Sequence, residues 1–151
     1  MEKQGGSIMK KYIAYGSNLN LEQMSMRCPT AKVVGTTLLK DYQLTFRNVA
    51  TIEPKVGSVV PVAVWEIDEI SERALDRYEG YPRLYRKEYL DIEITGKKEK
   101  ALVYIMNIGE PSYPGRGYYD VILQGYYDVG LDTAYLEDAI KDTYKRMQQN
   151  S

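Results

Sequence analysis

The sequence lacks histidine entirely and contains a single cysteine, Cys28, among its 151 residues. Without histidine the chain has no Ser-His-Asp or Cys-His catalytic arrangement and no histidine-ligated metal site. One thiol forms neither an intrachain disulfide nor a thiolate zinc site, and this cysteine usage is typical of a reducing compartment. We therefore expect a cytoplasmic protein without a metal, whose acid–base chemistry falls to Asp, Glu, Lys, Tyr or Cys28.

Long apolar runs and an excess of positive charge are also missing. No run approaches the ~18 residues of a membrane span. The net charge of −1 provides no basic field for nucleic acid or for an anionic membrane surface. Residues 1–8 lack the apolar core of a signal peptide and are expected to form a flexible leader. Residues 9–151 fit a single domain, for which the sequence defines no oligomeric state.

Tyrosine is the residue that the sequence has in excess, with fifteen copies against one Phe and one Trp. A tyrosine combines an apolar ring with a hydroxyl that needs a hydrogen-bond partner. Most of the fifteen are expected to pack in the core or on the surface. The excess is also compatible with a polar pocket lined by tyrosine.

Hydrophobic patterning predicts strands and hairpins in the first two thirds of the chain and helices mainly at its end. Expected strands cover residues 9–15, two segments within 31–48, and residues 59–67, 88–95 and 101–108. Pro61 argues for an edge or a bulge in the strand 59–67. Loops are expected at 50–58 and 111–119, and a turn at 96–100. Expected helices follow the caps Asn20, Ser71 and Asp132 or lie at 119–130, and Gly80 ends the second helix. This order is typical of an α+β domain.

The stretch YGSNL, Tyr15 to Leu19, lies between the first expected strand and the first expected helix. Gly16 allows the backbone to approach a ligand closely, and the amides of residues 17–19 then lie just ahead of a helix N-terminus. Such an arrangement binds carboxylates or oxyanions. A plain strand-to-helix turn explains the same residues, so the stretch alone leaves both interpretations open.

Glu79 lies in the last turn of an expected helix, just before Gly80. A carboxylate there faces the negative end of the helix dipole, which is unfavourable by ~0.3–1 kcal/mol. The flanking rings of Tyr78, Tyr81 and Tyr85 would desolvate it and raise its pKa. A raised pKa suits a group that takes and gives a proton near neutral pH. A solvated glutamate in a helix cap is the alternative interpretation.

The remaining motifs indicate no cofactor. The stretch YPGRGYY offers Gly115 and Gly117 but lacks the third glycine of a dinucleotide-binding loop, and no P-loop motif is present. We interpret this stretch as a flexible loop over a site. Cys28, which precedes Pro29, is expected to be a buried small residue.

Three stretches taken together resemble the γ-glutamylcyclotransferase family and its AIG2-like members. They are YGSNL near the start, EGYPRLY in the middle, and YYDVILQGYYDVGLDTAYLEDAI near the end. The resemblance covers roughly residues 9–140. EGYP with its following tyrosine is closer to the branch that acts on γ-glutamylamine-type substrates, whereas YGSNL is closer to the branch that acts on γ-glutamyl amino acids.

The resemblance implies a small mixed β-barrel with flanking helices. It also implies a reaction that converts a γ-glutamyl amide to 5-oxoproline and a free amine. In this reaction the α-amine of the glutamyl group attacks its own γ-carbonyl, so the enzyme needs no serine, cysteine, metal or cofactor. The expected partner is a small-molecule γ-glutamyl substrate.

By the same resemblance Glu79 is the catalytic general acid and base. The matched substrate-binding residues are Tyr15, Gly16, Ser17, Asn18, Leu19, Tyr85 and Tyr118, and the last match could shift to Tyr119. Two alternatives stay open. The chain could be a binding module that holds γ-glutamyl or other acidic small molecules without turnover, or it could act on a γ-glutamyl group carried by a larger partner.

Overall fold

The computed structural model of the chain describes residues 8–150, so residues 1–7 of the expected leader lie outside the described residues. The described part has five strands, four α-helices and one 3₁₀ turn. The elements in chain order are β1 (Lys10–Ala14), η1 (Ser17–Leu19), α1 (Leu21–Arg27), β2 (Lys32–Arg47), β3 (Val49–Ile67), α2 (Glu69–Glu79), β4 (Tyr85–Ile94), β5 (Lys97–Met106), α3 (Arg116–Val129) and α4 (Ala134–Gln149).

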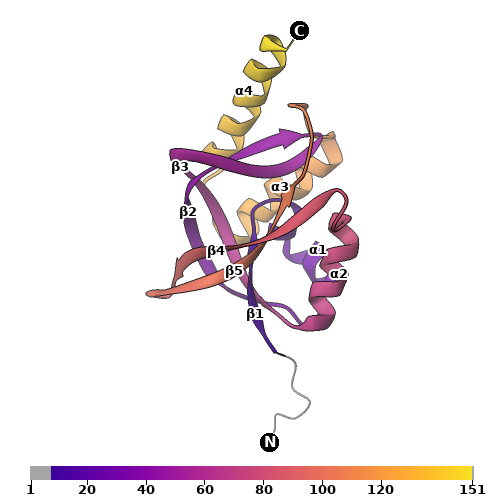
Figure 1. Cartoon of the computed structure of the whole chain (residues 1–151), viewed down its shortest axis with the longest axis vertical. Helices are drawn as coiled ribbons and strands as arrows, with labels where there is room; N and C mark the ends of the chain where they lie inside the picture. Colours follow the sequence, from indigo (N-terminus) through magenta and orange to yellow (C-terminus); the bar gives the residue numbers. More distant parts are fainter. Residues whose placement is uncertain (1–7, 151) are drawn as a thin grey trace, which may run out of the picture.

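The five strands form one strongly twisted sheet in the order β2-β3-β1-β5-β4 (Figure 1). β1 pairs antiparallel with β3 and parallel with β5, and the other neighbours are antiparallel. The expected α+β class is confirmed. The word barrel applies only loosely, because β2 and β4 are not paired within residues 8–150 and the sheet stays open.

The middle of the sheet is buried because its strands carry nearly continuous apolar runs. Val60, Val62 and Val64 of β3 are fully buried, as is Leu102 of β5. Pro61 is tolerated in β3 because β1 ends opposite Ala63, so at the proline β3 pairs only with β2. The local edge that Pro61 suggested is therefore present inside an otherwise central strand.

The β2–β3 hairpin differs from the expectation of two short strands followed by a loop at 50–58. Both strands are long and turn at Asn48, which has a positive φ of 69°. The residues around Gly57, whose composition is typical of a loop, lie at an irregularity in the pairing of β2 with β3. Lys40 pairs with Val59 and Tyr42 with Pro54, and Asp41 between them accepts a hydrogen bond of 2.9 Å from the Gly57 amide.

Helix ends follow local capping. Asn20 caps α1 as predicted, and its side chain accepts a 2.9 Å bond from the Gln23 amide. Ser71 was the wrong cap for α2, because Asp68 accepts a 2.8 Å bond from the Ser71 amide and starts the helix three residues earlier. Gly80 ends α2 in the left-handed conformation, as predicted.

Three other boundaries differ from the expected ones. α3 begins at Arg116, inside the expected loop 111–119. α4 begins at Ala134, whose amide donates a 2.9 Å bond to the Asp132 carboxylate, although Thr133 occupies the cap position. The β4–β5 turn is the short Thr95–Gly96 pair, because the charged residues after it belong to β5.

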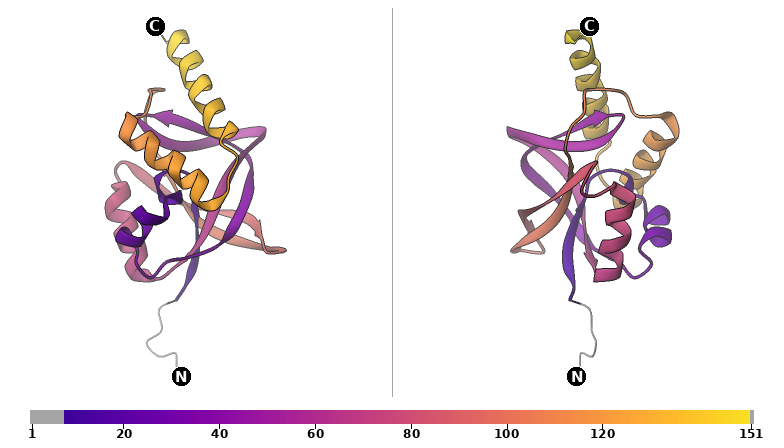
Figure 2. Two further views of the ribbon diagram at one scale, coloured as in Figure 1. Left: turned by 180° about the vertical axis from the view of Figure 1, so that it is seen from behind. Right: turned by 45° about the vertical axis from the view of Figure 1, so that its right-hand side comes forward.

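The helices lie around the sheet on different sides (Figure 2). α1 and α2 lie next to each other beside one end of β1, α3 packs against η1, and α4 runs away from β2 to the far end of the molecule. No helix within residues 8–150 is both long and apolar enough to cross a membrane. The end of β1, the end of α2 and the start of α3 therefore converge on one region.

Candidate active site

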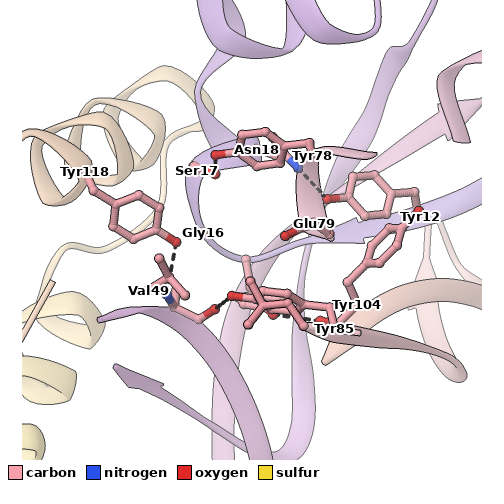
Figure 3. A pocket seen from close by; sticks show the side chains of 13 residues that line it. Tyr12, Gly16, Ser17, Asn18, Val49, Tyr78, Glu79, Tyr85, Tyr104 and Tyr118 are labelled. Carbon is pink, nitrogen blue, oxygen red and sulfur yellow. Dashed lines mark hydrogen bonds between the residues drawn. The ribbon is translucent and has the colours of Figure 1, made fainter. Parts of the chain in front are cut away.

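A cavity of about 220 Å³ lies where the turn after β1 faces the end of α2 and the start of β3 (Figure 3). Six of the thirteen residues that line it are tyrosines, and Glu79 is the one charged residue among them. The lining residues are Tyr12, Tyr15, Gly16, Ser17, Asn18, Val49, Ala50, Tyr78, Glu79, Leu84, Tyr85, Tyr104 and Tyr118. The tyrosine-lined pocket that the composition allowed for is present.

The turn from Gly16 to Leu19 includes two residues that line the cavity and whose backbone amides are unpaired. Glycine is favoured at position 16 because a Cβ there would lie 3.2 Å from the Ala50 Cβ, a tight contact. The expectation of three available amides needs correction, since the Leu19 amide donates to the Gly16 carbonyl at 3.0 Å. The amides of Ser17 and Asn18 donate to no group in residues 8–150, although both residues are buried.

The turn is held from outside the cavity. The Trp65 indole donates a 3.1 Å bond to the Asn18 carbonyl. Leu19 is fully buried and does not line the cavity, contrary to its expected place in the substrate-binding set. It packs instead against Gly125 of α3, where an added Cβ would lie 2.7 Å from the Leu19 Cβ. Leu19 therefore anchors the turn against α3.

Glu79 is the last residue of α2 and points into the cavity between Tyr12 and Tyr118 (Figure 3). Its carboxyl makes no hydrogen bond or ion pair with any residue in the range 8–150. Burial of the carboxyl raises its pKa to about 7, and the nearby Arg27 guanidinium only partly opposes this effect. A carboxyl with this pKa exchanges protons readily at neutral pH.

Arg27 connects α1 to both sides of the cavity. Its guanidinium carbon lies 3.5 Å from the centre of the Tyr78 ring, in a cation–π arrangement. It also donates hydrogen bonds to the side chains of Asn18 and Gln23. The Tyr78 hydroxyl in turn shares a 2.8 Å hydrogen bond with the Ser17 hydroxyl. The turn and the residue preceding Glu79 are thus fixed to each other.

Tyr85 and Tyr118 converge on Ala50 at the start of β3. The Tyr85 hydroxyl donates a 2.7 Å bond to the Ala50 carbonyl, and the Ala50 amide donates a 3.0 Å bond to the Tyr118 hydroxyl. The structure favours Tyr118 over its neighbour, because Tyr119 packs against Phe46 with ring centres 6.4 Å apart. Tyr118 accepts here and therefore keeps its own proton for another partner.

Tyr12 and Tyr104 also line the cavity, although no sequence motif predicts them there. They lie in β1 and β5, and their rings meet edge to face at 5.9 Å. Tyr15, which was expected, lines the cavity and donates a 2.7 Å bond to the Tyr104 carbonyl. No local motif marks Tyr12 or Tyr104, because both stand in ordinary strand patterns and reach the cavity only through the pairing of β1 with β5.

Two other expected features lie outside the cavity. Tyr81, expected beside Glu79, instead has its ring 4.4 Å from the Lys87 ammonium. Cys28 is buried as predicted, and burial raises its pKa, which keeps the thiol protonated. Among residues 8–150 no group of three or more His, Cys, Asp or Glu side chains is placed to hold a metal ion.

Comparisons with known proteins give a consistent result. A family model described as gamma-glutamyl cyclotransferase, AIG2-like, matches residues 12–128. The gamma-glutamylcyclotransferase of Homo sapiens is 30% identical over 143 residues, which cover 83% of this chain and 74% of that protein. The Bos taurus protein of the same name is 31% identical over 141 residues, which cover 82% of this chain and 73% of that protein.

Solved structures agree with these relatives. A structure described as a gamma-glutamyl cyclotransferase superimposes with a TM-score of 0.80 at 27% identity, covering 87% of this chain and 86% of that one. YkqA from Bacillus subtilis shares the fold with a TM-score of 0.74 at 20% identity, covering 90% of this chain and 54% of that one. The chain therefore belongs to the γ-glutamyl cyclotransferase, AIG2-like family. The expected resemblance is confirmed, and so is the expectation of an enzyme of this kind.

Proposed function

We propose that this protein converts a γ-glutamyl amide to 5-oxoproline and a free amine, with Glu79 as the general acid and base. One observation carries the proposal. A carboxyl with a pKa of about 7 and no protein partner in residues 8–150 lies in the same cavity as the two unpaired amides of Ser17 and Asn18. A group that accepts protons and a pair of donors for a negative oxygen are the two requirements of this ring closure.

Binding would fold the glutamyl group against the turn. The amides of Ser17 and Asn18 receive its carboxylate or the developing oxyanion, and no lysine or arginine of residues 8–150 lines the cavity to do so instead. Holding the α-amine against the γ-carbonyl supplies part of the ~7–11 kcal/mol available from intramolecular reaction. Tyr15, Tyr85 and Tyr118 complete the walls around this folded chain.

The proton balance needs only one group. Glu79 removes a proton from the α-ammonium, and the freed amine forms a C–N bond to the γ-carbonyl carbon. The resulting tetrahedral oxyanion collapses and breaks the original amide C–N bond. Glu79 gives its proton to the departing nitrogen as this bond breaks. The carboxylate then removes the second proton from the ring nitrogen and passes it to the released amine, which leaves as an ammonium ion. The lactam is therefore neutral, the Glu79 carboxylate is restored and no cofactor is consumed.

The shape of the cavity favours a free small substrate over one carried by a larger partner. Most lining residues are buried, including Tyr12, Tyr15 and Tyr85, and only Tyr78 and Leu84 are more than two fifths exposed. A substrate tethered to a carrier needs a longer open groove. The presence of Glu79 favours turnover over binding alone.

The test is release of 5-oxoproline from a panel of γ-glutamyl amides by wild-type protein and by Glu79→Gln and Glu79→Asp. Glu79→Gln keeps the shape but accepts no proton, so turnover should fall by ~10²–10⁴ while substrate still binds. Glu79→Asp withdraws the carboxylate by one methylene and should also be badly impaired.

Glu69→Gln is the matched control, because Glu69 lies on the exposed face of the same helix in an ion pair with Arg73. It should turn over like the wild type. Circular dichroism serves as the folding control. Wild-type turnover by Glu79→Gln would reject the assigned role, and a wild-type protein that binds the amides without turnover would support the binding module.

A further inference from the structure

A chain of hydrogen bonds leads from α1 to the cavity wall through side chains that have no role in the proposed reaction so far. Arg27 donates to the Asn18 Oδ1 atom. The Asn18 Nδ2 atom donates a 2.8 Å bond to the Tyr12 hydroxyl. Tyr12 is 3% exposed and lines the cavity (Figure 3).

The direction of this chain is fixed by its first member. A guanidinium carries donors only, so it must face the oxygen of the Asn18 carboxamide. The amide nitrogen of Asn18 is then left facing Tyr12, and it too has only donors. The Tyr12 oxygen therefore accepts, and its own proton must be used elsewhere. No acceptor in residues 8–150 receives this proton.

We propose that Tyr12 donates this proton to a carboxylate or carbonyl oxygen of the bound glutamyl group, and that Arg27 and Asn18 are positioning residues that fix its direction. The inference rests on the proposed function for the identity of the ligand. Burial and a smaller contribution from Glu79 raise the pKa of Tyr12 well above its ordinary value, so the hydroxyl stays protonated. A buried donor without an acceptor is costly until a ligand supplies one.

Tyr104 provides the matched comparison. Its ring lines the same cavity and touches the Tyr12 ring. Its hydroxyl points to α2 instead, where it donates a 2.6 Å bond to the Asp76 carboxylate. Replacing Tyr12 by Phe therefore removes the proposed hydrogen bond to the ligand, whereas replacing Tyr104 by Phe removes a hydrogen bond between β5 and α2.

The first experiment measures kcat/KM with the best γ-glutamyl amide and binding of 5-oxoproline by calorimetry. Tyr12→Phe should lower kcat/KM about 10- to 100-fold and weaken 5-oxoproline binding, as expected when a buried hydrogen bond to a charged or polarised oxygen is lost. Tyr104→Phe should lower both by no more than about threefold, with its main effect on thermal stability. Equal losses in the two variants would overturn the inference.

The second experiment tests the direction of the chain. Asn18→Asp replaces the nitrogen that faces Tyr12 with an acceptor, so Tyr12 turns its proton to the new carboxylate and away from the ligand. If the new carboxylate acted only through its charge, it would lower kcat/KM equally in the wild type and in Tyr12→Phe. If it acts by taking the Tyr12 proton, it has little further effect in Tyr12→Phe, which already lacks that proton. The cost of Asn18→Asp should therefore be at least about fivefold smaller in Tyr12→Phe than in the wild type. Additive losses would overturn the relay.

These outcomes are distinct from a failure of the proposed function. A wild-type protein that neither forms nor binds 5-oxoproline rejects the function and this inference together. A wild type that does either, with Tyr12→Phe no worse than Tyr104→Phe, rejects only the inference. If Tyr12→Phe does not give a native circular dichroism spectrum, Asn18→Asp and Asn18→Leu decide, since both keep the Tyr12 ring. Asn18→Asp should then be the more impaired, because Leu leaves the Tyr12 proton free for the ligand.

Discussion

Glu79 combines three features that each disfavour an ionised carboxylate. It is the last residue of a helix, where the dipole is negative, its carboxyl is buried, and it has no hydrogen-bond partner in residues 8–150. A position that keeps such a group at a cost in stability is typical of a functional site. Because an ionised Glu79 lowers the stability of the fold, its environment can be tested by unfolding experiments without substrate.

The pH dependence of stability should reveal Glu79. Its pKa is about 7 in the folded chain and near 4.5 when unfolded, so the folded state binds the proton more tightly. Below pH 4.5 both states are protonated and there is no penalty, and the penalty grows until about pH 7. At pH 8 we therefore expect Glu79→Gln to melt at a higher temperature than the wild type.

The difference in melting temperature between Glu79→Gln and the wild type should shrink toward zero near pH 4.5. Thermal unfolding followed by circular dichroism across this range measures it. Equal melting temperatures at pH 8 would mean that the carboxyl is solvated. Catalysis should follow the opposite course, because Glu79 is a base only when ionised, and kcat/KM should rise through about pH 7.

Cavity-lining residues with a local signature were predictable, and those brought in by strand pairing were not. Glu79 stands out beside Gly80 at a helix end, and Gly16 stands out in a strand-to-helix turn. Tyr12 and Tyr104 carry no such mark in a chain with fifteen tyrosines. Their place depends on the register of β1 with β5, which is a long-range property.

At the scale of elements, composition misleads where a strand leaves the core. The segment 50–58 contains Pro54 and Gly57 and looks like a loop, yet it is part of β3. Its exposed residues have no apolar face to reveal a strand, and its partner β2 supplies the order through the Asp41 side chain. Buried segments such as β5, with their apolar runs, were predictable for the opposite reason.

Gly125 shows how a helix sets the geometry of the turn. A Cβ at this position would lie 2.7 Å from the Leu19 backbone carbon and 2.8 Å from the Asn20 amide nitrogen, and neither atom can yield locally. Alanine favours a helix over glycine by about 1 kcal/mol. Gly125→Ala should nevertheless destabilise the protein by about 1–3 kcal/mol, since the turn must be displaced.

The same displacement moves the amides of Ser17 and Asn18, so the KM of Gly125→Ala should rise. Gly117→Ala in the same helix is the control, because a Cβ there meets nothing within 4 Å. Its stability should be unchanged or higher by up to about 1 kcal/mol. Urea unfolding and steady-state kinetics give both values. A stabilised Gly125→Ala with native KM would contradict this account of α3.

At the scale of the whole molecule, the cavity is built from segments distant in sequence, and α4 contributes none of its lining. Besides its buried apolar residues, α4 is linked to the β2–β3 hairpin by one carboxylate. In β3, the Glu53 Oε2 atom lies 2.8 Å from Nη2 of Arg146 in α4, and its Oε1 atom lies 2.8 Å from Nη2 of Arg47 in β2. Gln43 adds a 2.9 Å hydrogen bond. This arrangement separates the attachment of α4 from the chemistry of the cavity.

Glu53→Gln should therefore lower stability and leave turnover intact. Burial acts to raise the pKa of Glu53, but the bonds from Arg146, Gln43 and Arg47 outweigh it, and the pKa lies below its usual 4.5. The carboxylate thus stabilises the fold above pH 4.5 and loses this contribution as the pH falls further. We expect a loss of about 1–3 kcal/mol at pH 7, which diminishes in acid.

Urea unfolding at pH 7 and pH 3.5, with kcat/KM measured alongside, tests the separation. Asp91→Asn is the control, because the Asp91–Lys100 pair is largely exposed and should contribute under about 1 kcal/mol. If Glu53→Gln loses no more stability than Asp91→Asn, α4 is held by its apolar face, including Leu136 and Ala139. If its kcat/KM falls by more than its unfolded fraction explains, the loss of the Glu53 carboxylate disturbs the cavity through β3. The residue of β3 affected would then be Ala50, which is bonded to both Tyr85 and Tyr118.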